Sequence, residues 1–81
     1  MNIIHDREKQ QFSCLINDHE AQLNYKKLEV DKIDIYRTYV PDTLRGQGIA
    51  GELVTAALDW AKGEQIQVVA SCWYAAKKIK S

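Results

Sequence analysis

A strand, a glycine-bearing turn and an amphipathic helix follow one another between residues 33 and 62, and this unit restricts the fold more than any other feature. Residues 33–40 are rich in Ile, Tyr, Thr and Val, which suit a pleated surface. Pro41 ends this predicted strand, because proline cannot donate to a central ladder. Apolar residues at 3–4 spacing then predict a helix over 48–62, with Gly63 at its left-handed C′ position.

The remaining segments supply partners for this unit. Strands are predicted at 2–5, 11–16, 21–25 and 66–71, a turn at Asn17-Asp18, a loop or bulged connection over 26–32, and a short helix over 72–80. Strands on either side of a crossover helix run parallel. We therefore predict an α+β fold in which a mixed sheet carries one long crossover helix and a short C-terminal helix.

The apolar pattern of the strand over 33–40 changes phase along its length. Ile33 and Ile35 share one face, whereas Tyr36 and Val40 lie on the other. A β-bulge would produce this slip, and so would burial of both faces. The pattern alone does not decide between these two explanations.

Length and composition limit the class of protein. With 81 residues the chain is expected to form one domain, residues 1–81. The formal net charge is zero, so global charge gives no reason to expect nucleic acid or a membrane surface as a partner. Two cysteines and two histidines lack the spacing of a zinc site, so no metal is expected. Two free thiols and the lack of an apolar leader or spanning run favour a cytoplasmic protein.

The turn at residues 44–50 has the placement of an anion site. The first turn of a helix has unpaired N–H groups and a partial positive charge. Small residues let a phosphate approach those amides, and Arg45 adds a guanidinium fork that suits phosphate oxygens. The Walker A and dinucleotide motifs do not match. A tight turn that needs glycine only for its backbone is the competing interpretation.

The segment Arg45-Gly46-Gln47-Gly48-Ile49-Ala50 resembles the Arg/Gln-x-x-Gly-x-Gly/Ala signature of the GNAT acetyltransferase superfamily. The likeness covers about residues 10–78 and is strongest across 36–60. Within the superfamily, the chain is most similar to a small single-domain group that ends soon after a cysteine. The resemblance implies a minimal GNAT-like mixed sheet with a splayed central strand.

The same resemblance implies a coenzyme site. Acetyl-CoA would be the cosubstrate, with its pantetheine arm paired to the backbone of Thr38, Tyr39 and Val40. Ordinary strand packing is the plain alternative for these three. The coenzyme's pyrophosphate would be held by amides of the turn, which comprises Arg45, Gly46, Gln47, Gly48, Ile49 and Ala50.

Cys72 is the candidate catalytic residue, because the small group carries a cysteine near the acetyl end of the cofactor. A thiol that opens a helix can have a lowered pKa, although cysteine is often only a small buried apolar residue. Two departures weigh against catalysis. The group commonly has His-Thr where this chain has Arg37-Thr38, and a proline where it has Ala70. Asp34 is expected on a solvated face, and no carboxylate is an obvious general base. Tyr74 could protonate a leaving thiolate, with aromatic packing as the plain alternative. Surface positions are expected for His5 and His19, and core or rim positions for Trp60 and Trp73.

Three functions compete at this stage. The first is an acetyl-CoA-dependent N-acetyltransferase acting on a small amine or a protein amino group that the sequence does not identify. The second is a non-catalytic module that binds CoA or acetyl-CoA. The third is an interaction protein that has kept the fold and lost the ligand. Exposed sheet edges make a monomer or a weak homodimer the expected state.

Overall fold

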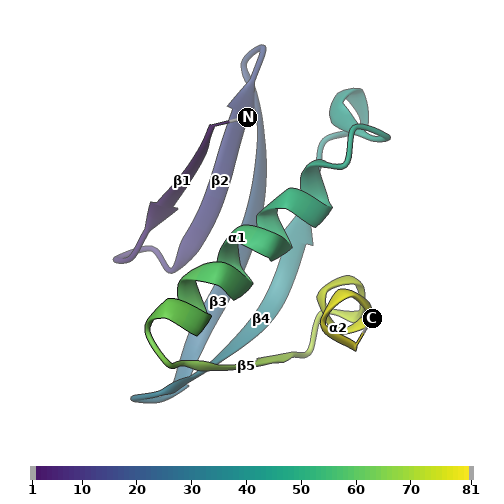
Figure 1. Ribbon diagram of the computed structural model, residues 1–81. Coiled ribbons are helices and arrows are strands. Elements are labelled where there is room, and N and C mark those ends of the chain that lie inside the picture. The colour runs from purple at the N-terminus through teal and green to yellow at the C-terminus, as the bar shows by residue number, and fades with distance from the viewer. Residues whose placement is uncertain (1, 81) are drawn as a thin grey trace.

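The computed structural model describes residues 2–80 (Figure 1). Its elements, in chain order, are β1 (Ile3–Asp6), β2 (Gln11–Ile16), β3 (His19–Glu29), β4 (Lys32–Tyr39), the 3₁₀ helix η1 (Asp42–Leu44), α1 (Ile49–Gly63), β5 (Gln67–Ala70) and α2 (Trp73–Lys80). Every predicted strand and helix is present, and most bounds agree to within two residues.

The five strands form one mixed sheet in the order β1-β2-β3-β4-β5. The first three pairings are antiparallel and the last, between β4 and β5, is parallel. Helix α1 is the crossover between those two parallel strands and lies across one face of the sheet, while α2 sits beside β4 and β5 (Figure 1). The predicted α+β architecture is confirmed.

The β2–β3 connection is the two-residue turn that the sequence predicts. Asn17 and Asp18 have φ of 50° and 66°, the paired left-handed conformations of a hairpin turn whose twist matches that of the strands. Of the two alternatives predicted over 26–32, the loop is wrong, because β3 continues to Glu29 and pairs with the start of β4. The bulged connection is confirmed, because the register of this pairing shifts between Lys27 and Glu29. This end of β3 is exposed and mostly polar, and it is held by backbone pairing with β4. Its sequence therefore lacks the alternation of apolar and polar residues that would have predicted a strand.

Strand β4 contains a bulge opposite β3. Asn24 pairs with Arg37 and Tyr25 pairs with Ile35, so Tyr36 has no partner across the ladder. The bulge accounts for the phase change in the apolar pattern. Burial of both faces contributes as well, because three successive residues, Ile33, Asp34 and Ile35, are buried. A bulge bends its strand, so β4 changes direction just before its pocket-lining half.

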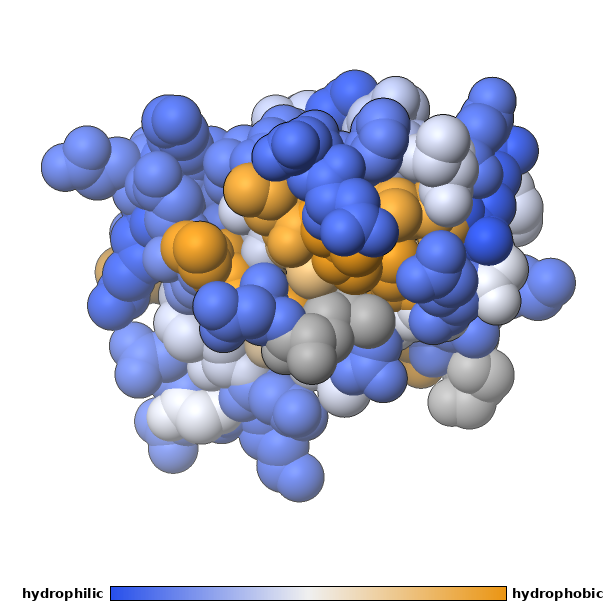
Figure 2. Space-filling view, turned by 90° about the horizontal axis from the view of Figure 1, so that it is seen from above, coloured by the Kyte–Doolittle hydropathy of each residue, from blue (hydrophilic) through white to orange (hydrophobic). Residues whose placement is uncertain are grey.

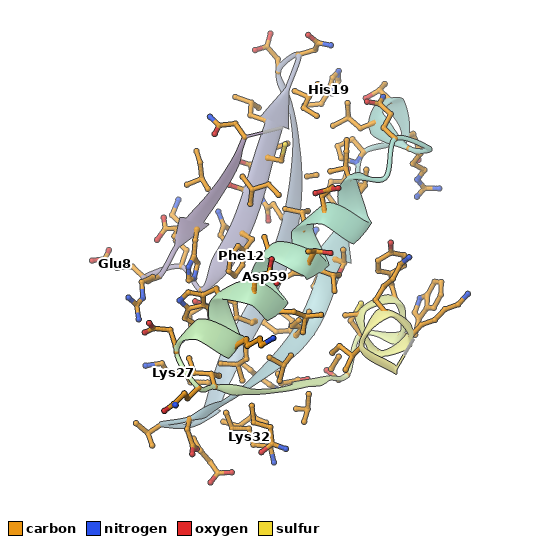
Figure 3. All side chains as sticks on the ribbon, in the orientation of Figure 1. Glu8, Phe12, His19, Lys27, Lys32 and Asp59 are labelled. Atoms are coloured by element: carbon orange, nitrogen blue, oxygen red, sulfur yellow. The ribbon has the colours of Figure 1, made fainter. Side chains whose placement is uncertain are left out.

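The core lies between the sheet and α1, whose buried residues are Ile49, Leu53, Val54, Ala57 and Ala61. Phe12 points from β2 toward this helix, whereas His19 lies at the far end of the hairpin (Figure 3). Figure 2 shows the molecule from above the view of Figure 1, and on this surface apolar residues gather in the middle with hydrophilic residues around them.

An aromatic cluster closes the other end of this core. Its members are His5, Phe12, Tyr25 and Trp60. The expectation that His5 is a surface residue is wrong, because its ring stacks on Phe12 at 4.0 Å and its Nε2 lies 2.6 Å from the Tyr25 hydroxyl. Burial, and then the charge of Arg7, lower the pKa of His5. The lowered pKa favours the neutral form of the His5 ring as the hydrogen-bond partner of Tyr25.

The end of α1 differs from its prediction by two positions. Gly63 lies inside the helix, and the left-handed residue is Gln65, with φ of 57°. The Gln65 amide donates to the Lys62 carbonyl at 3.2 Å, and the Ile66 amide donates to the Ala61 carbonyl at 2.8 Å. These two bonds form a Schellman motif with Gln65 at C′.

Candidate functional site

A pocket of about 490 Å³ opens where the end of β4, the turn before α1 and the start of α2 meet. Its lining consists of Thr38, Val40, Leu44, Arg45, Gly46, Gly48, Ile49, Ala50, Cys72, Trp73 and Tyr74. The fold therefore brings together all the candidate site residues except Tyr39 and Gln47, which do not line it. Leu44, Trp73 and Tyr74 complete the wall, and only Tyr74 had been singled out from the sequence as a possible participant.

The turn before α1 needs glycine at two positions. Gly46 and Gly48 have φ of 82° and 75°, in the left-handed region that side chains rarely adopt. A Cβ added at either position would meet no protein atom within 4 Å. The glycines thus shape the turn, and they also leave open space in front of its backbone.

Helix α1 begins with uncapped amides at this turn. The Glu52 amide donates to the Gly48 carbonyl at 3.1 Å, so the amides before it, those of Ile49, Ala50 and Gly51, precede the helical ladder. Within residues 2–80 no side chain caps this helix start. Unpaired donors and the positive end of the helix dipole therefore lie at one wall of the pocket.

Arg45 supplies a positive charge at the same wall. Its Nε lies 3.1 Å from Asp42 Oδ1, and the two side chains are 73% and 89% exposed. An exposed pair of this kind contributes about 0–1 kcal/mol. Arg45 can therefore leave Asp42 for a phosphate oxygen at little cost in free energy.

Strand β4 has a free edge beside the pocket. Its pairing with β5 ends at Ile35 and Ala70, although β4 itself continues to Tyr39. The amides of Ser71 and Cys72 both donate to the Ile35 carbonyl at 3.1 Å, and the chain then turns into α2. Residues 36–39 have no strand neighbour on this side in the described part of the chain. The two parallel strands are thus splayed, as the resemblance implies.

Cys72 lies at this fork, immediately before α2. Its Sγ donates to Thr38 Oγ1 at 3.6 Å, which joins the two sides of the opening. Burial raises the pKa of the Cys72 thiol, but hydrogen bonds outweigh this effect and bring the pKa below its ordinary value. They come from the Ala75 backbone, the Thr38 side chain and the Tyr74 backbone. Cys72 is therefore a half-buried thiol in an activated setting.

Two side chains are placed differently from expectation. Asp34 was expected on a solvated face and is only 6% exposed, because β4 is an inner strand of the sheet. Both of its oxygens accept hydrogen bonds from Ser71. Trp73 was expected in the core or at its rim and is 76% exposed, at the edge of the pocket.

Position 37 points away from the pocket. Arg37 Nη1 donates to Asn24 Oδ1 at 3.2 Å and to Gln22 Oε1 at 3.4 Å, and its guanidinium lies 5.2 Å from the centre of the Tyr39 ring. Thr38 faces Cys72, and successive side chains of a strand lie on opposite faces. A histidine at position 37 of this backbone would thus also start on the face away from Cys72.

Within residues 2–80, no three His, Cys, Asp or Glu side chains are grouped in a way that would hold a metal ion. No helix of this range has the length and apolar character that crossing a bilayer requires.

The mixed five-stranded sheet with splayed parallel strands and a crossover helix places the chain in the α+β class of GNAT-like folds, and sequence comparison identifies the family. Residues 11–81 match the family described as GCN5-related N-acetyl-transferase. The chain belongs to this family.

Relatives along nearly the whole chain support the assignment. The chain is 38% identical over 82 residues to protein NATD1 of Xenopus tropicalis, covering 99% of this chain and 75% of that protein. The mouse (Mus musculus) NATD1 is 39% identical, with 99% and 74% covered, and the human (Homo sapiens) NATD1 is 38% identical, with 99% and 73% covered. A GCN5-like protein of Staphylococcus aureus, solved in solution, superposes with a TM-score of 0.77 at 26% identity, covering 98% of this chain and 78% of that one.

Proposed function

We propose that this protein binds acetyl-CoA in the pocket between β4, α1 and α2 and transfers the acetyl group to an amine. The observation that carries the proposal is the uncapped start of α1, whose residues Gly48, Ile49 and Ala50 line a pocket that Cys72 also lines. Family membership supports the choice of coenzyme. The volume of about 490 Å³ lies within the usual range for small-molecule sites.

Each part of the coenzyme has a chemically suited wall. The diphosphate would accept hydrogen bonds from the amides of residues 45–50, with Arg45 beside it. The pantetheine arm carries amide groups, which would pair with the free backbone edge of β4 at residues 38–40, as an added strand does. The thioester would then lie near Thr38 and Cys72, at the closed end of the fork.

The transfer itself needs few protein groups. A neutral amine attacks the thioester carbonyl, an N–C bond forms, the C–S bond breaks, and the CoA thiolate takes up a proton. Backbone N–H groups aimed at the carbonyl oxygen would stabilise the charge that develops there. In a second version the Cys72 thiolate attacks the thioester and CoA leaves as its thiolate; the amine then attacks acetyl-Cys72, and the Cys72 thiolate is released.

A binding module without turnover is the second candidate. Of the side chains that line the pocket, none is a carboxylate or a histidine, so no conventional general base stands beside the thioester. An enzyme built this way depends on the amine arriving deprotonated. Its rate would therefore increase with pH up to the pKa of the acceptor amine.

Calorimetric titration with acetyl-CoA, CoA and ATP tests the binding. We expect a micromolar Kd for the two coenzyme forms, about −8 kcal/mol, and weaker binding of ATP. Failure of acetyl-CoA and CoA to bind the folded protein at millimolar concentration would refute the proposal.

A thiol-release assay over a panel of amines separates the enzyme from the module. Amine-dependent release of CoA above the hydrolysis background supports transfer, and its absence with intact binding supports the module. Cys72→Ala distinguishes the two chemical routes. Direct transfer survives this substitution, whereas the covalent route is lost, together with the acetylated Cys72 peptide that mass spectrometry would detect in the wild type.

A further inference from the structure

We infer that the buried carboxylate of Asp34 is a positioning group for Cys72, because it fixes Ser71 at the point where β5 ends and the chain turns toward α2. The positioning stands on its own, whereas its consequence for catalysis rests on the proposed function. The resemblance assigns no role to Asp34 or Ser71, and neither residue lines the pocket.

The burial of Asp34 requires an explanation. Asp34 is only 6% exposed. A buried carboxylate without hydrogen-bond partners would strongly destabilise the fold. Its Oδ1 accepts from the Ser71 amide at 2.7 Å, and its Oδ2 accepts from Ser71 Oγ at 2.8 Å. Asp34 takes part in none of the ion pairs among the described residues. Both bonds of this carboxylate therefore act on one residue.

These bonds lie at the end of the β4–β5 ladder. The Ser71 amide is shared between Asp34 Oδ1 and the Ile35 carbonyl, and the Cys72 amide also donates to that carbonyl. In a parallel ladder, evenly spaced bonds come from alternate residues, so two successive amides on one carbonyl mark the end of pairing. The carboxylate thus holds the residue at which β5 departs from β4.

The environment of Cys72 follows from this departure. Its thiol contacts Thr38 on one side of the fork and the backbone of Ala75 and Tyr74 on the other. These donors favour the thiolate only if α2 begins at its present place. If Ser71 is released, Cys72 keeps the burial that opposes ionisation but loses hydrogen-bond donors that favour it, so the pKa of its thiol rises.

The test compares the pH dependence of Cys72 alkylation by iodoacetamide in four proteins, resolved by site with mass spectrometry. Asp34→Ala removes both bonds, whereas Asp34→Asn keeps an oxygen for the Ser71 amide and a donor for its hydroxyl. Asn24→Ala is the matched control, since Asn24 is a buried polar residue of the same size on β3, bonded on the opposite face to Thr38. Buried Cys14 reports in every sample whether the fold is intact.

We expect Asp34→Ala to raise the midpoint of the Cys72 profile by about one pH unit, which lowers the thiolate fraction at neutral pH about tenfold. Asp34→Asn should restore most of the shift, and Asn24→Ala should leave the profile unchanged. The other titratable side chains lining the pocket, Arg45 and Tyr74, are common to all four proteins. A profile of folded Asp34→Ala that superimposes on the wild type overturns the inference.

Ser71→Ala is the milder variant to use if Asp34→Ala does not fold. It removes one of the two bonds and should move the midpoint in the same direction by a smaller amount. An unchanged midpoint there overturns the inference. The assay requires no coenzyme, so its result is independent of whether acetyl-CoA binds.

Discussion

Substitutions at Gly48 separate the two roles of this residue in the turn. Gly48 is the N-cap of α1, with φ of 75° and ψ of 14°, and it lines the pocket. A left-handed backbone makes any side chain there a source of strain, and the open space in front of it makes any side chain an obstacle to a ligand. Alanine, asparagine and valine at this position should therefore rank in one order for thermal stability and in another order for ligand affinity.

Strain sets the effect on folding. A Cβ in the left-handed conformation costs about 1–2 kcal/mol, and asparagine tolerates this conformation better than alanine does. A β-branched residue there is a genuine outlier. We expect Tm to fall least for Gly48→Asn, further for Gly48→Ala and most for Gly48→Val. Each kcal/mol lowers Tm by about 4–8 °C in a domain of this size.

Occlusion sets the effect on binding. The added Cβ meets no protein atom within 4 Å, so further side-chain atoms extend into the space assigned to the diphosphate. One hydrogen bond to a charged group contributes about 1.5–3 kcal/mol, so the loss of one weakens binding by about 10- to 150-fold. Affinity for acetyl-CoA should therefore follow side-chain volume, with the alanine variant tightest and the valine variant weakest.

Gly63→Ala is the control for this series. It adds the same methyl group inside the other end of α1, where a Cβ also meets nothing within 4 Å and φ is not positive. Its affinity should equal that of the wild type. The measurements are calorimetric titration with acetyl-CoA and thermal unfolding by circular dichroism. Affinities that follow the Tm order, with the asparagine variant tightest, would refute the diphosphate placement and leave only the backbone role of Gly48.

Three further substitutions test other parts of the structure. Burial, and then the charge of Arg7, lower the pKa of His5, so as pH falls the unfolded chain protonates this histidine before the folded protein does. The stabilising effect of the neutral His5 ring is therefore present above about pH 6.5 and is lost as pH falls below that value. Urea unfolding at pH 7 and pH 5 should show a smaller loss for His5→Gln than for the wild type; equal losses contradict this. Gly51→Ala should raise stability by about 0.5–1 kcal/mol, because the new Cβ would lie 3.7 Å from Tyr74 Oη, an ordinary contact; a lower Tm in thermal melts would show that Tyr74 cannot accommodate it. Arg45→Ala should change stability by less than about 0.5 kcal/mol but weaken acetyl-CoA binding and reduce its salt dependence, as titrations at two ionic strengths would reveal.

Local signals were sufficient for most of the fold. The hairpin turn at Asn17 and Asp18, the strand before Pro41 and the periodicity of α1 each depend on neighbouring residues, so the sequence shows them directly. The second half of β3 depends on pairing with β4, and the helix end at Gln65 depends on two backbone bonds that a side-chain pattern does not encode. These are the places where prediction and structure differ.

The candidate site divides in the same way. The turn at residues 44–50 was predictable, because its chemistry lies in one continuous segment. Asp34 and Ser71 are 37 positions apart, and their contact exists only because β4 and β5 are neighbours. His5 on β1 and Tyr25 on β3 are 20 positions apart, and they meet because β1 and β3 lie on either side of β2. In the sequence alone, a buried polar residue whose partner is distant along the chain looks the same as a polar residue that faces water.

The geometry of β4 also changes what its departures from the family pattern mean. If residue 37 faced the thioester, an arginine there would deprive the site of a base, because guanidinium stays protonated. The Arg37 side chain instead joins Gln22 and Asn24 on the face opposite to Thr38, and it lies over the ring of Tyr39. Thr38 faces Cys72 across the fork. The arginine at position 37 therefore changes the contacts on the polar face of the sheet and does not remove a group from the pocket. Whether the protein can catalyse acetyl transfer depends instead on the groups around Cys72.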